Sequence, residues 1–410
     1  MKSLKTLCVV LLLLVIASAM VFATGKQEGK AKAELSFYWA LYEGMRDEYR
    51  EDLQSAFNAA NPEYNLTVVP VDWDKLWDKL TTSLAAGNPP DMSIIGTRWL
   101  LDLMDMDAVV EVTPYVSQAT LDNIAPGAME AKIGGKLMGL PFAAGSRFMA
   151  YNADITTTVP ATMEELREAA IAATTKDTYG MIMVGGKHTE LTDFCYYFYA
   201  AGGEFFDADG KSAVASPAGI KALEFMVKLA NEDKVVQDGF LSQDRHAAHP
   251  VFFAGKTGYV MIGAWADKSH QDAAAAWPIQ YCQIPPFEGN DPAPLIITDS
   301  IALFKASKNL EGIGKFIDFF YQDEWKAVLD KDIGFPPVTI SASARPEFQT
   351  PMYAAMAEAN LSAKGWPLVA GWAEVGSTIW DAVQKAYLGQ ASPARALKAA
   401  AKTIDGIMAE

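Results

Sequence analysis

Between residues 34 and 95, segments with the hydrophobic pattern of strands alternate with segments that have the pattern of helices. This alternation constrains the fold more than any other feature. Glu34–Trp39, Asn65–Val71 and Asp91–Ile95 are short and rich in apolar residues, which predicts three strands. Between them lie two helical stretches, residues 45–57 and 74–86, whose apolar residues recur about every four positions. Because parallel strands need crossover connections, this order predicts an α/β fold with a parallel sheet covered by helices.

Three later helix starts carry capping signals. Thr162 opens the capping box T-M-E-E, while Ser216-Pro217 and Ser392-Pro393 each combine an N-cap serine with proline at the first helical position. Gly258–Ile262 and Leu295–Phe304 are further predicted strands. Helices therefore continue to alternate with strands, and the last part of the chain is predicted to be mostly helical.

The N-terminus has the layout of an export signal. Lys2 and Lys5 precede Leu7–Ile16, an unbroken run of ten apolar residues, whereas about 20 are needed to span a bilayer. Small residues follow, and we expect cleavage after Ala23, with a cut after Ala19 as the alternative. Residues 1–23 are thus a predicted signal peptide of a periplasmic protein.

Further predictions concern a lipid-attachment motif, the segment that follows the signal peptide, and the pairing of the cysteines. Cys8 lies before the apolar run, so no lipobox is expected, and residues 24–33 are predicted to form a flexible leader. Pairing of Cys195 with Cys282 is left open. Export permits a disulfide, but the aromatic run around Cys195 equally suits a buried free thiol.

Charge narrows the classes of partner. Lys and Arg number 34 and Asp and Glu number 50, so the net charge is −16. This acidic balance disfavours nucleic acids and anionic membranes, because phosphate groups would be repelled. Four His leave little material for histidine chemistry, whereas ten Trp supply a large flat aromatic surface.

The sequence contains no complete motif for catalysis or for cofactor binding. Gly255-Lys256-Thr257 ends like a phosphate loop, but Pro250 stands where the first glycine is required. No G-x-G-x-x-G follows the first strand, and neither G-x-S-x-G nor H-E-x-x-H occurs. Asp244, His246 and His249 have a helical spacing suited to metal, but a solvated helix face is the preferred interpretation. We therefore expect no enzyme, no metal and no cofactor.

Short segments recur in a specific order along the chain. AAGNPPD, GLPF followed by YN, and FAGK followed by GAW are the most specific, and TMEELREAA, YAAGGEFFD and DSIALFKASKNLEGIGKF accompany them. In this order they resemble the extracellular solute-binding proteins of bacterial ABC importers, the sugar-binding family that includes maltose-binding protein. The resemblance spans about residues 34–340. Met163 replaces a tryptophan common in the family, and the last 70 residues match only loosely.

The resemblance implies two α/β lobes joined by crossing hinge strands, with the ligand in a central cleft. The expected N-terminal lobe is 34–144 with 299–340, and the expected C-terminal lobe is 145–298 with 341–410. Closure of the lobes around a mono- or oligosaccharide would present a monomeric protein to the permease subunits of an ABC transporter. An exported carbohydrate-active enzyme and a sensor component are the alternatives.

A sugar is bound by an aromatic ring against its C–H face and by polar side chains at its hydroxyls, beyond the carboxyl ends of strands. Trp39 and Glu43 follow the first strand, although Trp39 equally fits a core and Glu43 a helix start. Thr97 and Arg98 follow the third strand, where the family places contacts. Asp299 lies at the second crossing, in an otherwise apolar strand.

The remaining candidates belong to the second lobe. Ser146 and Arg147 lie at the first crossing, and Arg147 has no obvious packing role there. Glu190 and Asp193 are assigned to the loop after a strand at Met181–Val184, where the family supplies a carboxylate.

Trp265 is the strongest candidate, because in the family an aromatic residue after this strand stacks on the sugar, and Asp267 follows it. Trp380 matches the family's late aromatic residue but equally fits a core, and Trp366 and Trp372 are weaker candidates. For Trp73 and Trp77 a packed helix face is preferred. The ligand is not identified, and Arg98 with Arg147 keeps a phosphate- or carboxylate-bearing sugar as an alternative.

Overall fold

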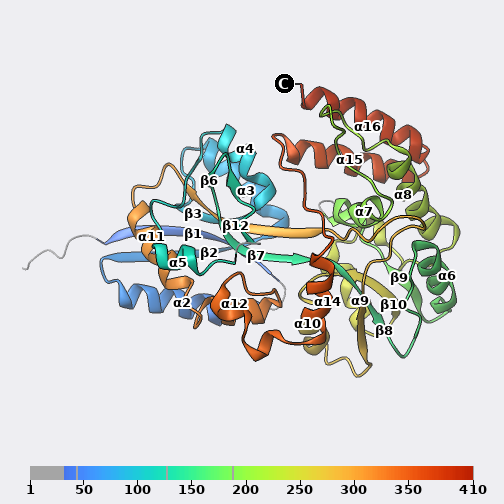
Figure 1. The fold of residues 1–410 in the computed structure, drawn as a ribbon, viewed down its shortest axis with the longest axis horizontal. Helices are drawn as coiled ribbons and strands as arrows, with labels where there is room; N and C mark the ends of the chain where they lie inside the picture. The colour runs from blue at the N-terminus through green and yellow to red at the C-terminus, as the bar shows by residue number, and fades with distance from the viewer. Residues whose placement is uncertain (1–31, 43–44, 126–127, 187–188, 410) are drawn as a thin grey trace, which may run out of the picture.

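The structure, a computed structural model, describes residues 32–42, 45–125, 128–186 and 189–409, and of residues 189 and 190 the backbone alone. Two lobes, each with its own sheet and helices, lie side by side along the long axis (Figure 1). The strands are β1 (Ala33–Leu41), β2 (Tyr64–Asp72), β3 (Met92–Gly96), β4 (Val109–Val110), β5 (Lys132–Ile133), β6 (Lys136–Leu137), β7 (Leu140–Ser146), β8 (Phe148–Asn152), β9 (Tyr179–Ile182), β10 (Thr257–Ile262), β11 (Ile279–Cys282) and β12 (Ile296–Phe304).

The α-helices run through both lobes. They are α2 (Asp47–Ala60), α3 (Trp73–Ala85), α4 (Leu100–Asp105), α5 (Gln118–Asp122), α6 (Met163–Ala173), α7 (Thr189–Ala200), α8 (Pro217–Val227), α9 (Arg245–Phe253), α10 (Ala266–Asp272), α11 (Leu310–Phe320), α12 (Lys326–Ile333), α13 (Ile340–Ser343), α14 (Pro351–Asn360), α15 (Trp372–Tyr387) and α16 (Pro393–Ile407). A short 3₁₀ turn, η1 (Thr97–Trp99), follows β3 directly.

The sheet of the first lobe has the order β2-β1-β3-β12-β4, with β7 paired to β12. β1 is parallel to both β2 and β3, which confirms the predicted parallel β-α-β-α-β unit. Residues 35, 37 and 39 of β1 are buried, whereas the residues between them are partly exposed, as expected when one face of a strand packs on a core. β3 is buried along its whole length, as an inner strand should be.

The sheet of the second lobe has the order β11-β8-β10-β9. β10 is parallel to β9 and antiparallel to β8, so the sheet is mixed. The predicted strand Gly258–Ile262 corresponds to β10. One part of this sheet packs in a cluster with α6, α7, α8, α15 and α16. Other sheet residues, including Phe148, Ile182 and Ile262, belong to the cluster that continues into the first lobe.

The predicted capping signals place the helix starts correctly. The Thr162 hydroxyl accepts a hydrogen bond from the Glu165 amide at 3.1 Å, and the Glu165 carboxylate accepts one from the Ala161 amide at 2.8 Å. α8 and α16 begin at Pro217 and Pro393, each after a serine whose hydroxyl caps the first turn. These short-range signals work because they satisfy amides that the helix itself leaves unpaired.

Two neighbouring strands carry the chain between the lobes. β7 and β12 pair antiparallel from Leu140 with Ile301 to Ser146 with Ile296, and Figure 1 shows them running from one lobe toward the other. The pairing is interrupted by an irregularity between Asp299 and Ser300. Beyond it, the Arg147 amide donates to the Leu295 carbonyl at 2.8 Å. The connection is therefore a hydrogen-bonded two-stranded ribbon.

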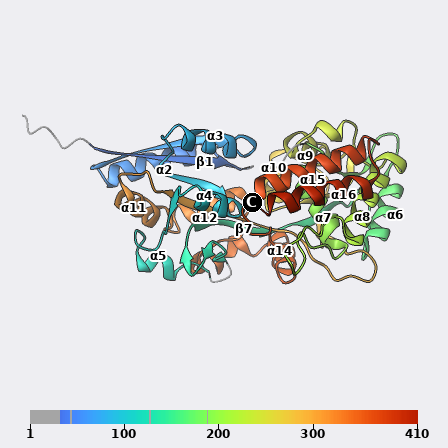
Figure 2. The ribbon, with the colours of Figure 1, turned by 90° about the horizontal axis from the view of Figure 1, so that it is seen from above.

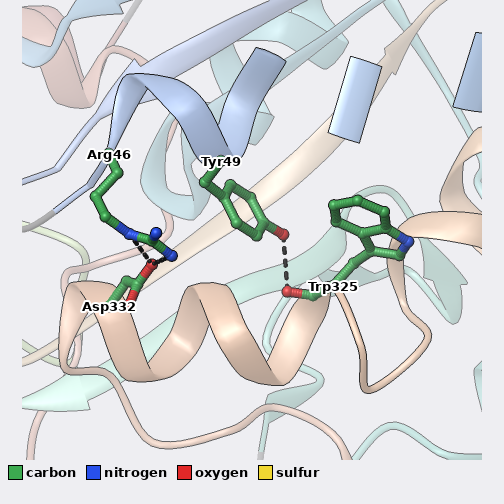
Figure 3. A network of polar contacts seen from close by, with 4 residues as sticks. All are labelled: Arg46, Tyr49, Trp325 and Asp332. Carbon is green, nitrogen blue, oxygen red and sulfur yellow. Dashed lines mark hydrogen bonds and ion pairs between the residues drawn. The ribbon is translucent and has the colours of Figure 1, made fainter. Parts of the chain in front are cut away.

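After β12 the chain first covers the first lobe. α12 lies along α2, as Figure 3 shows. The Arg46 guanidinium donates to Asp332 at 2.6 and 2.9 Å, and the Tyr49 hydroxyl donates to the Trp325 carbonyl at 2.7 Å. Beneath them, Lys326 and Asp330 form a fully buried ion pair one turn apart on α12.

The last helices return to the second lobe. α15 packs on α7 and α16 packs on α8, and Figure 2 shows α15 and α16 side by side on that lobe. α14 packs against β7, β8 and β11, close to the connecting ribbon. The chain after β12, residues 305–410, thus packs first on one lobe and then on the other.

One local prediction is wrong. Residues 190 and 193, assigned to a loop after β9, lie on α7, which begins at Thr189. The helix was missed because its run F-C-Y-Y-F-Y is buried all round and shows no alternation between apolar and polar faces. Cys195 on this helix is buried, and Cys282 is half-buried. Both are free thiols, so the question of pairing is answered for this structure.

Candidate ligand site between the lobes

A cavity of about 340 Å³ lies between the lobes, lined by residues from both. Its first-lobe wall comes from the end of β1, α3, η1 and β12, and its second-lobe wall from the residue after β7 and from α7, α9 and α15. Seven of the ten tryptophans line it: Trp73, Trp77, Trp99, Trp265, Trp366, Trp372 and Trp380. Aromatic surface is therefore concentrated at one place in the molecule.

The tryptophans of the first-lobe wall pack on one another. Trp73 and Trp77 lie one turn apart on α3, with ring centroids 5.8 and 5.1 Å from that of Trp99. The edge of Tyr42 meets Trp73 at 5.5 Å. Trp73 and Trp77 are half-buried, so they pack together and still present surface to the cavity. The sequence predicted that Trp73 and Trp77 form a packed helix face. That prediction describes the side of each ring that packs on Trp99, but not the side that faces the cavity.

The C-terminal tryptophans close the opposite side. Trp366 and Trp372 lie 5.5 Å apart, and Trp380 follows two turns later on α15. Within the part of the chain that the structure describes, the indole N–H groups of Trp366 and Trp380 are buried without a hydrogen-bond partner. An unpaired buried donor is costly, so these two groups are available to an acceptor that enters the cavity.

A charged cluster occupies the middle of the cavity. Asp299, on β12, is 4 % exposed and accepts a hydrogen bond from the Tyr42 hydroxyl at 2.8 Å. Arg98, Arg147 and Arg245 each interact electrostatically with it. Burial raises the pKa of Asp299 to about 6, and the three guanidinium groups oppose this rise. At pH 7 the carboxyl group is therefore mostly ionised.

The three arginines come from distant parts of the sequence. Arg98 lies in η1 after β3, Arg147 between β7 and β8, and Arg245 at the start of α9. Burial lowers the pKa of Arg98, and the neighbouring guanidinium groups of Arg147 and Arg245 lower it further. The fold thus holds three like charges close together, which requires compensating interactions.

Aromatic rings and glycines hold these guanidinium groups in place. Arg98 lies over Trp99 at 5.0 Å, while Arg147 and Arg245 lie over Trp265 at 4.6 and 5.1 Å, all within cation–π range. A Cβ atom at Gly96 would lie 2.5 Å from the Arg98 Nη1 atom. A Cβ atom at Gly263 would overlap both Arg147 and the Trp265 ring. Glycine at these two positions therefore leaves the room that the arginines occupy.

Trp265 lines the cavity, as predicted, but most of its surface is covered by other side chains. Only 5 % of the residue is exposed, and its ring stacks on His249 at an interplanar angle of 18°. With two guanidinium groups over the ring as well, little of its face is left for a sugar. Trp265 serves as a platform for the arginines.

Trp39 needs correction, because it lies in the first-lobe core and not at the cavity. It is fully buried, with its ring edge-on to Phe37, Phe142 and Phe320. The signal was present in the sequence, since Trp39 shares the inward face of its strand with Leu35 and Phe37.

Four other candidates are not among the residues that line the cavity, and each is hydrogen-bonded to another segment of the chain. The Thr97 hydroxyl is 2.8 Å from that of Ser300, and the Ser146 hydroxyl donates to Asn360 at 2.6 Å. Asp193 is buried and accepts from the Val184 amide at 3.2 Å, and Asp267 accepts from the Tyr281 hydroxyl.

Burial raises the pKa of Asp193 well above its usual range. Glu43 and the side chain of Glu190 lie outside the described part of the chain. The structure therefore brings Arg98, Arg147, Trp265, Asp299 and Trp380 of the predicted set to the cavity.

Arg245 is the main residue that sequence reasoning missed. The segment was considered only for its histidines and the metal that they might bind, although Asp244 is a recognisable N-cap that places Arg245 at a helix start. Among the described residues, no group of three His, Cys, Asp or Glu side chains could hold a metal ion.

Two contacts join the lobes beside the cavity. The Asp102 carboxylate on α4 accepts a hydrogen bond at 2.5 Å from the amide of Gly371, the residue before α15. On the opposite side, Gly334 at the end of α12 approaches the Ala264 carbonyl so closely that any Cβ atom would overlap it. Within the described ranges, no helix is both long and apolar enough to cross a membrane.

Known proteins share this architecture. A putative binding protein of Brucella abortus is 30 % identical over 381 residues, covering 90 % of this chain and 92 % of its own length. Maltose-bound MalE3 of T. maritima superposes with a TM-score of 0.83 at 20 % identity, covering 92 % of this chain and all of that one. A Thermotoga lettingae solute-binding protein bound to α-D-tagatose gives a TM-score of 0.82 at 20 % identity, with the same coverage.

The two structural matches confirm the predicted fold of two α/β lobes around a cleft. The sequence pattern of one family also matches residues 42–327, which is well over half of the chain. The chain therefore belongs to the bacterial extracellular solute-binding protein family.

Proposed function

We propose that the protein captures a carbohydrate in the cavity between its lobes and delivers it to the permease of an ABC importer. The cavity itself carries this proposal, because it combines tryptophan surface with charged groups at one place. A sugar offers an apolar C–H face to aromatic rings and hydroxyl groups to polar side chains, so both kinds of wall have a use. The maltose and α-D-tagatose held by two structural neighbours support a carbohydrate ligand.

The proposed contacts differ from the predicted set. Arg98, Arg147, Asp299 and Trp380 remain as proposed ligand contacts, and Arg245 and Trp77 join them because they line the same cavity. The four hydrogen-bonded candidates outside the lining are proposed to position these groups.

Capture is proposed to proceed by lobe closure. We take the lobes as residues 34–144 with 299–340 and 145–298 with 341–410, turning about the β7–β12 ribbon. The hydrogen bond from the Gly371 amide to Asp102 joins the two lobes beside the cavity and supports a closed arrangement in this structure. A closed form that differs in shape from the open form is what a permease can recognise.

The proposed location is the periplasm. The predicted signal peptide would be cleaved after Ala23 and, with no lipobox expected, leave a monomeric protein without a lipid anchor. Membership of an extracellular solute-binding family supports export.

Titration of the intrinsic tryptophan fluorescence of the mature protein tests the proposal. Because seven tryptophans line the cavity, we expect the fluorescence of the protein to change when a ligand binds. With a panel of neutral and acidic mono- and oligosaccharides, at least one should bind with micromolar or tighter affinity, and chromatography of the incubated sugar should show no product.

Trp380→Ala should weaken that binding at least tenfold. Trp277→Ala is the matched control, because Trp277 is half-buried outside the cavity. Turnover of the sugar, or no binding by any sugar in the panel, would contradict the proposal.

A further inference from the structure

The end of α12 meets the second lobe backbone to backbone, and this contact points to a residue that controls lobe closure. We propose that Gly334 is a positioning residue for ligand capture: because it has no side chain, the lobes close fully, and any side chain there would hold them apart. This step rests on the proposed function, since it concerns the closure by which capture is proposed to proceed.

The first support is that α12 is fastened to the first lobe. The Arg46 guanidinium on α2 donates to Asp332, and the Tyr49 hydroxyl on the same helix donates to the Trp325 carbonyl, as Figure 3 shows. Gly334 ends α12 with φ of 78°, in the left-handed region that favours glycine. The first lobe therefore sets the position of Gly334.

The second support is the atom that Gly334 faces. Ala264 lies between β10 and α10 of the second lobe and is 1 % exposed. A Cβ atom at Gly334 would lie 1.9 Å from the Ala264 carbonyl oxygen and 3.3 Å from the Trp265 backbone nitrogen, whereas Cβ atoms essentially never come within 3.0 Å of such an atom. Because the carbonyl belongs to the backbone, no change of rotamer relieves this overlap. A side chain at Gly334 therefore requires a backbone displacement of at least about 1.1 Å, the difference between 3.0 and 1.9 Å.

The third support is the place of the contact in the molecule. Phe335 and Trp265, the next residues on its two sides, both line the cavity. The contact therefore lies on the side of the molecule that lobe closure brings together. Phe335 also lies against the ribbon, because a Cβ atom at Gly145 of β7 would be 3.2 Å from the Phe335 ring. Since the contact is close to the pivot, a small gap there would open the far rim of the cavity by a larger distance.

A glycine at the end of a helix also has a more general explanation, because the left-handed conformation alone favours it. Gly389, two residues beyond the end of α15, separates the two explanations. Its φ is 68°, and among the described residues no atom lies within 4 Å of the place where its Cβ would be. Gly389→Ala therefore has the conformational cost of a left-handed alanine without the overlap, and it is the matched control for Gly334→Ala.

Fluorescence titration of the mature protein with named sugars tests the inference. The probes are glucose, galactose, galacturonate, maltose, maltotriose and α-D-tagatose, and stopped-flow mixing gives the rate constants. For each probe that binds the wild-type protein, Gly334→Ala should raise the dissociation constant about tenfold or more relative to Gly389→Ala. The loss should appear as faster dissociation, with the association rate changed by less than about twofold, because the open form still receives the sugar.

A second variant and a second measurement separate closure from stability. Asparagine tolerates the left-handed conformation better than alanine does, so Gly334→Asn should melt at a higher temperature than Gly334→Ala. Its larger side chain should nevertheless weaken binding at least as much. In small-angle X-ray scattering at saturating sugar, the radius of gyration should decrease on binding for the wild-type protein and Gly389→Ala. For both Gly334 variants the decrease should be less than about half as large.

The outcomes separate the inference from the proposed function. Equal affinities for Gly334→Ala and Gly389→Ala would overturn the inference and leave sugar binding intact. Weaker binding with an undiminished decrease in the radius of gyration would overturn it as well, because Gly334 would then act on the cavity and not on closure. Circular dichroism reports folding, and loss of the fold in both Gly334 variants would show that every folded form contains the contact, which contradicts a role in closure. Binding of no probe to the wild-type protein would overturn the proposed function and the inference together.

Discussion

Trp73 and Trp77 on the first-lobe wall of the cavity differ in their surroundings from Trp265 on the second-lobe wall. On the first-lobe wall, Trp73 and Trp77 pack against Trp99 and remain half-buried, so part of each ring faces the cavity. On the second-lobe wall, Trp265 is 5 % exposed beneath the guanidinium groups of Arg147 and Arg245. Trp73 and Trp77 therefore offer aromatic surface, whereas the Trp265 ring holds two charged groups in place. The same residue type at the same cavity thus has two physical roles.

Replacing one tryptophan from each wall should give the largest contrast. Trp265→Ala removes a buried ring and should lower the free energy of unfolding by about 3–5 kcal/mol, and ligand affinity should fall as Arg147 and Arg245 lose the ring beneath them. Trp77→Ala should lower it by only about 1–2 kcal/mol and weaken acidic and neutral sugars alike. Urea denaturation and calorimetric titration measure both effects. Equal loss of stability in the two variants would show that the walls do not differ in this way.

The pH dependence of the free energy of unfolding tests the charged surroundings of Asp299. Its pKa is about 6 in the folded protein, raised by burial above an ordinary value near 4. As pH rises from about 4 to 6, the unfolded chain releases this proton first, so the carboxyl group lowers the stability of the folded state progressively over that range. It adds no further change above the range.

Asp299→Asn should abolish that contribution, which is on the order of 2–3 kcal/mol. The measurement is the difference between the unfolding free energies of the two proteins at pH 4, 5, 6 and 7. Asp330, whose pKa burial also raises to about 6, remains in both proteins and cancels in the difference. A difference that does not change with pH would contradict the assignment.

The hydrogen bond from the Gly371 amide to Asp102 should have a smaller effect, because it joins the walls from outside the cavity. The carboxylate accepts from the amide at the N-terminus of α15, an interaction worth about 1 kcal/mol. Asp102→Ala should therefore weaken ligand affinity about fivefold, and amide exchange at residues 371–376 should speed up in the liganded protein. Unchanged affinity together with faster exchange would show that the contact stabilises the helix alone.

The surface pair Arg46–Asp332 should have the smallest effect, since it lies within one lobe and away from both walls. The Arg46 side chain is half exposed, so water screens the pair. Arg46→Gln should lower the free energy of unfolding by less than about 1 kcal/mol and leave ligand affinity unchanged. A change in affinity would mean that the packing of α12 on α2, shown in Figure 3, reaches the cavity.

Sequence patterns correctly predicted the features of the fold that depend on interactions between residues close together in the chain. The first three strands, the Thr162 capping box and the proline helix starts are correct, because periodicity and caps depend on residues a few positions apart. The solute-binding family, predicted from the order of several short segments, is confirmed as well by the family match over residues 42–327.

The cavity was harder to predict, because its side chains come from segments far apart. Arg98, Arg147 and Arg245 are distant in the sequence and come close together only in the folded chain. No local sequence pattern predicts that all three interact with Asp299. Trp39 and Trp265 both follow or end strands, yet one ring enters a core and the other supports two cations. Which face of a strand or turn is buried depends on the partner elements, and a single sequence does not contain that information directly.

In the proposed lobe closure the connecting ribbon is the pivot, and its position determines the order in which side chains reach the ligand. Asp299 lies on β12 beside its irregular pairing with β7, and Arg147 follows β7 directly. Groups near a pivot travel little when the lobes turn, whereas Trp77 and Trp380, carried by helices α3 and α15, travel farther. In an open protein the charges at the pivot would already be close to their final positions, and the outer rings would not. Recognition would then proceed in two stages, with rapid electrostatic docking at the pivot followed by slower enclosure between aromatic rings.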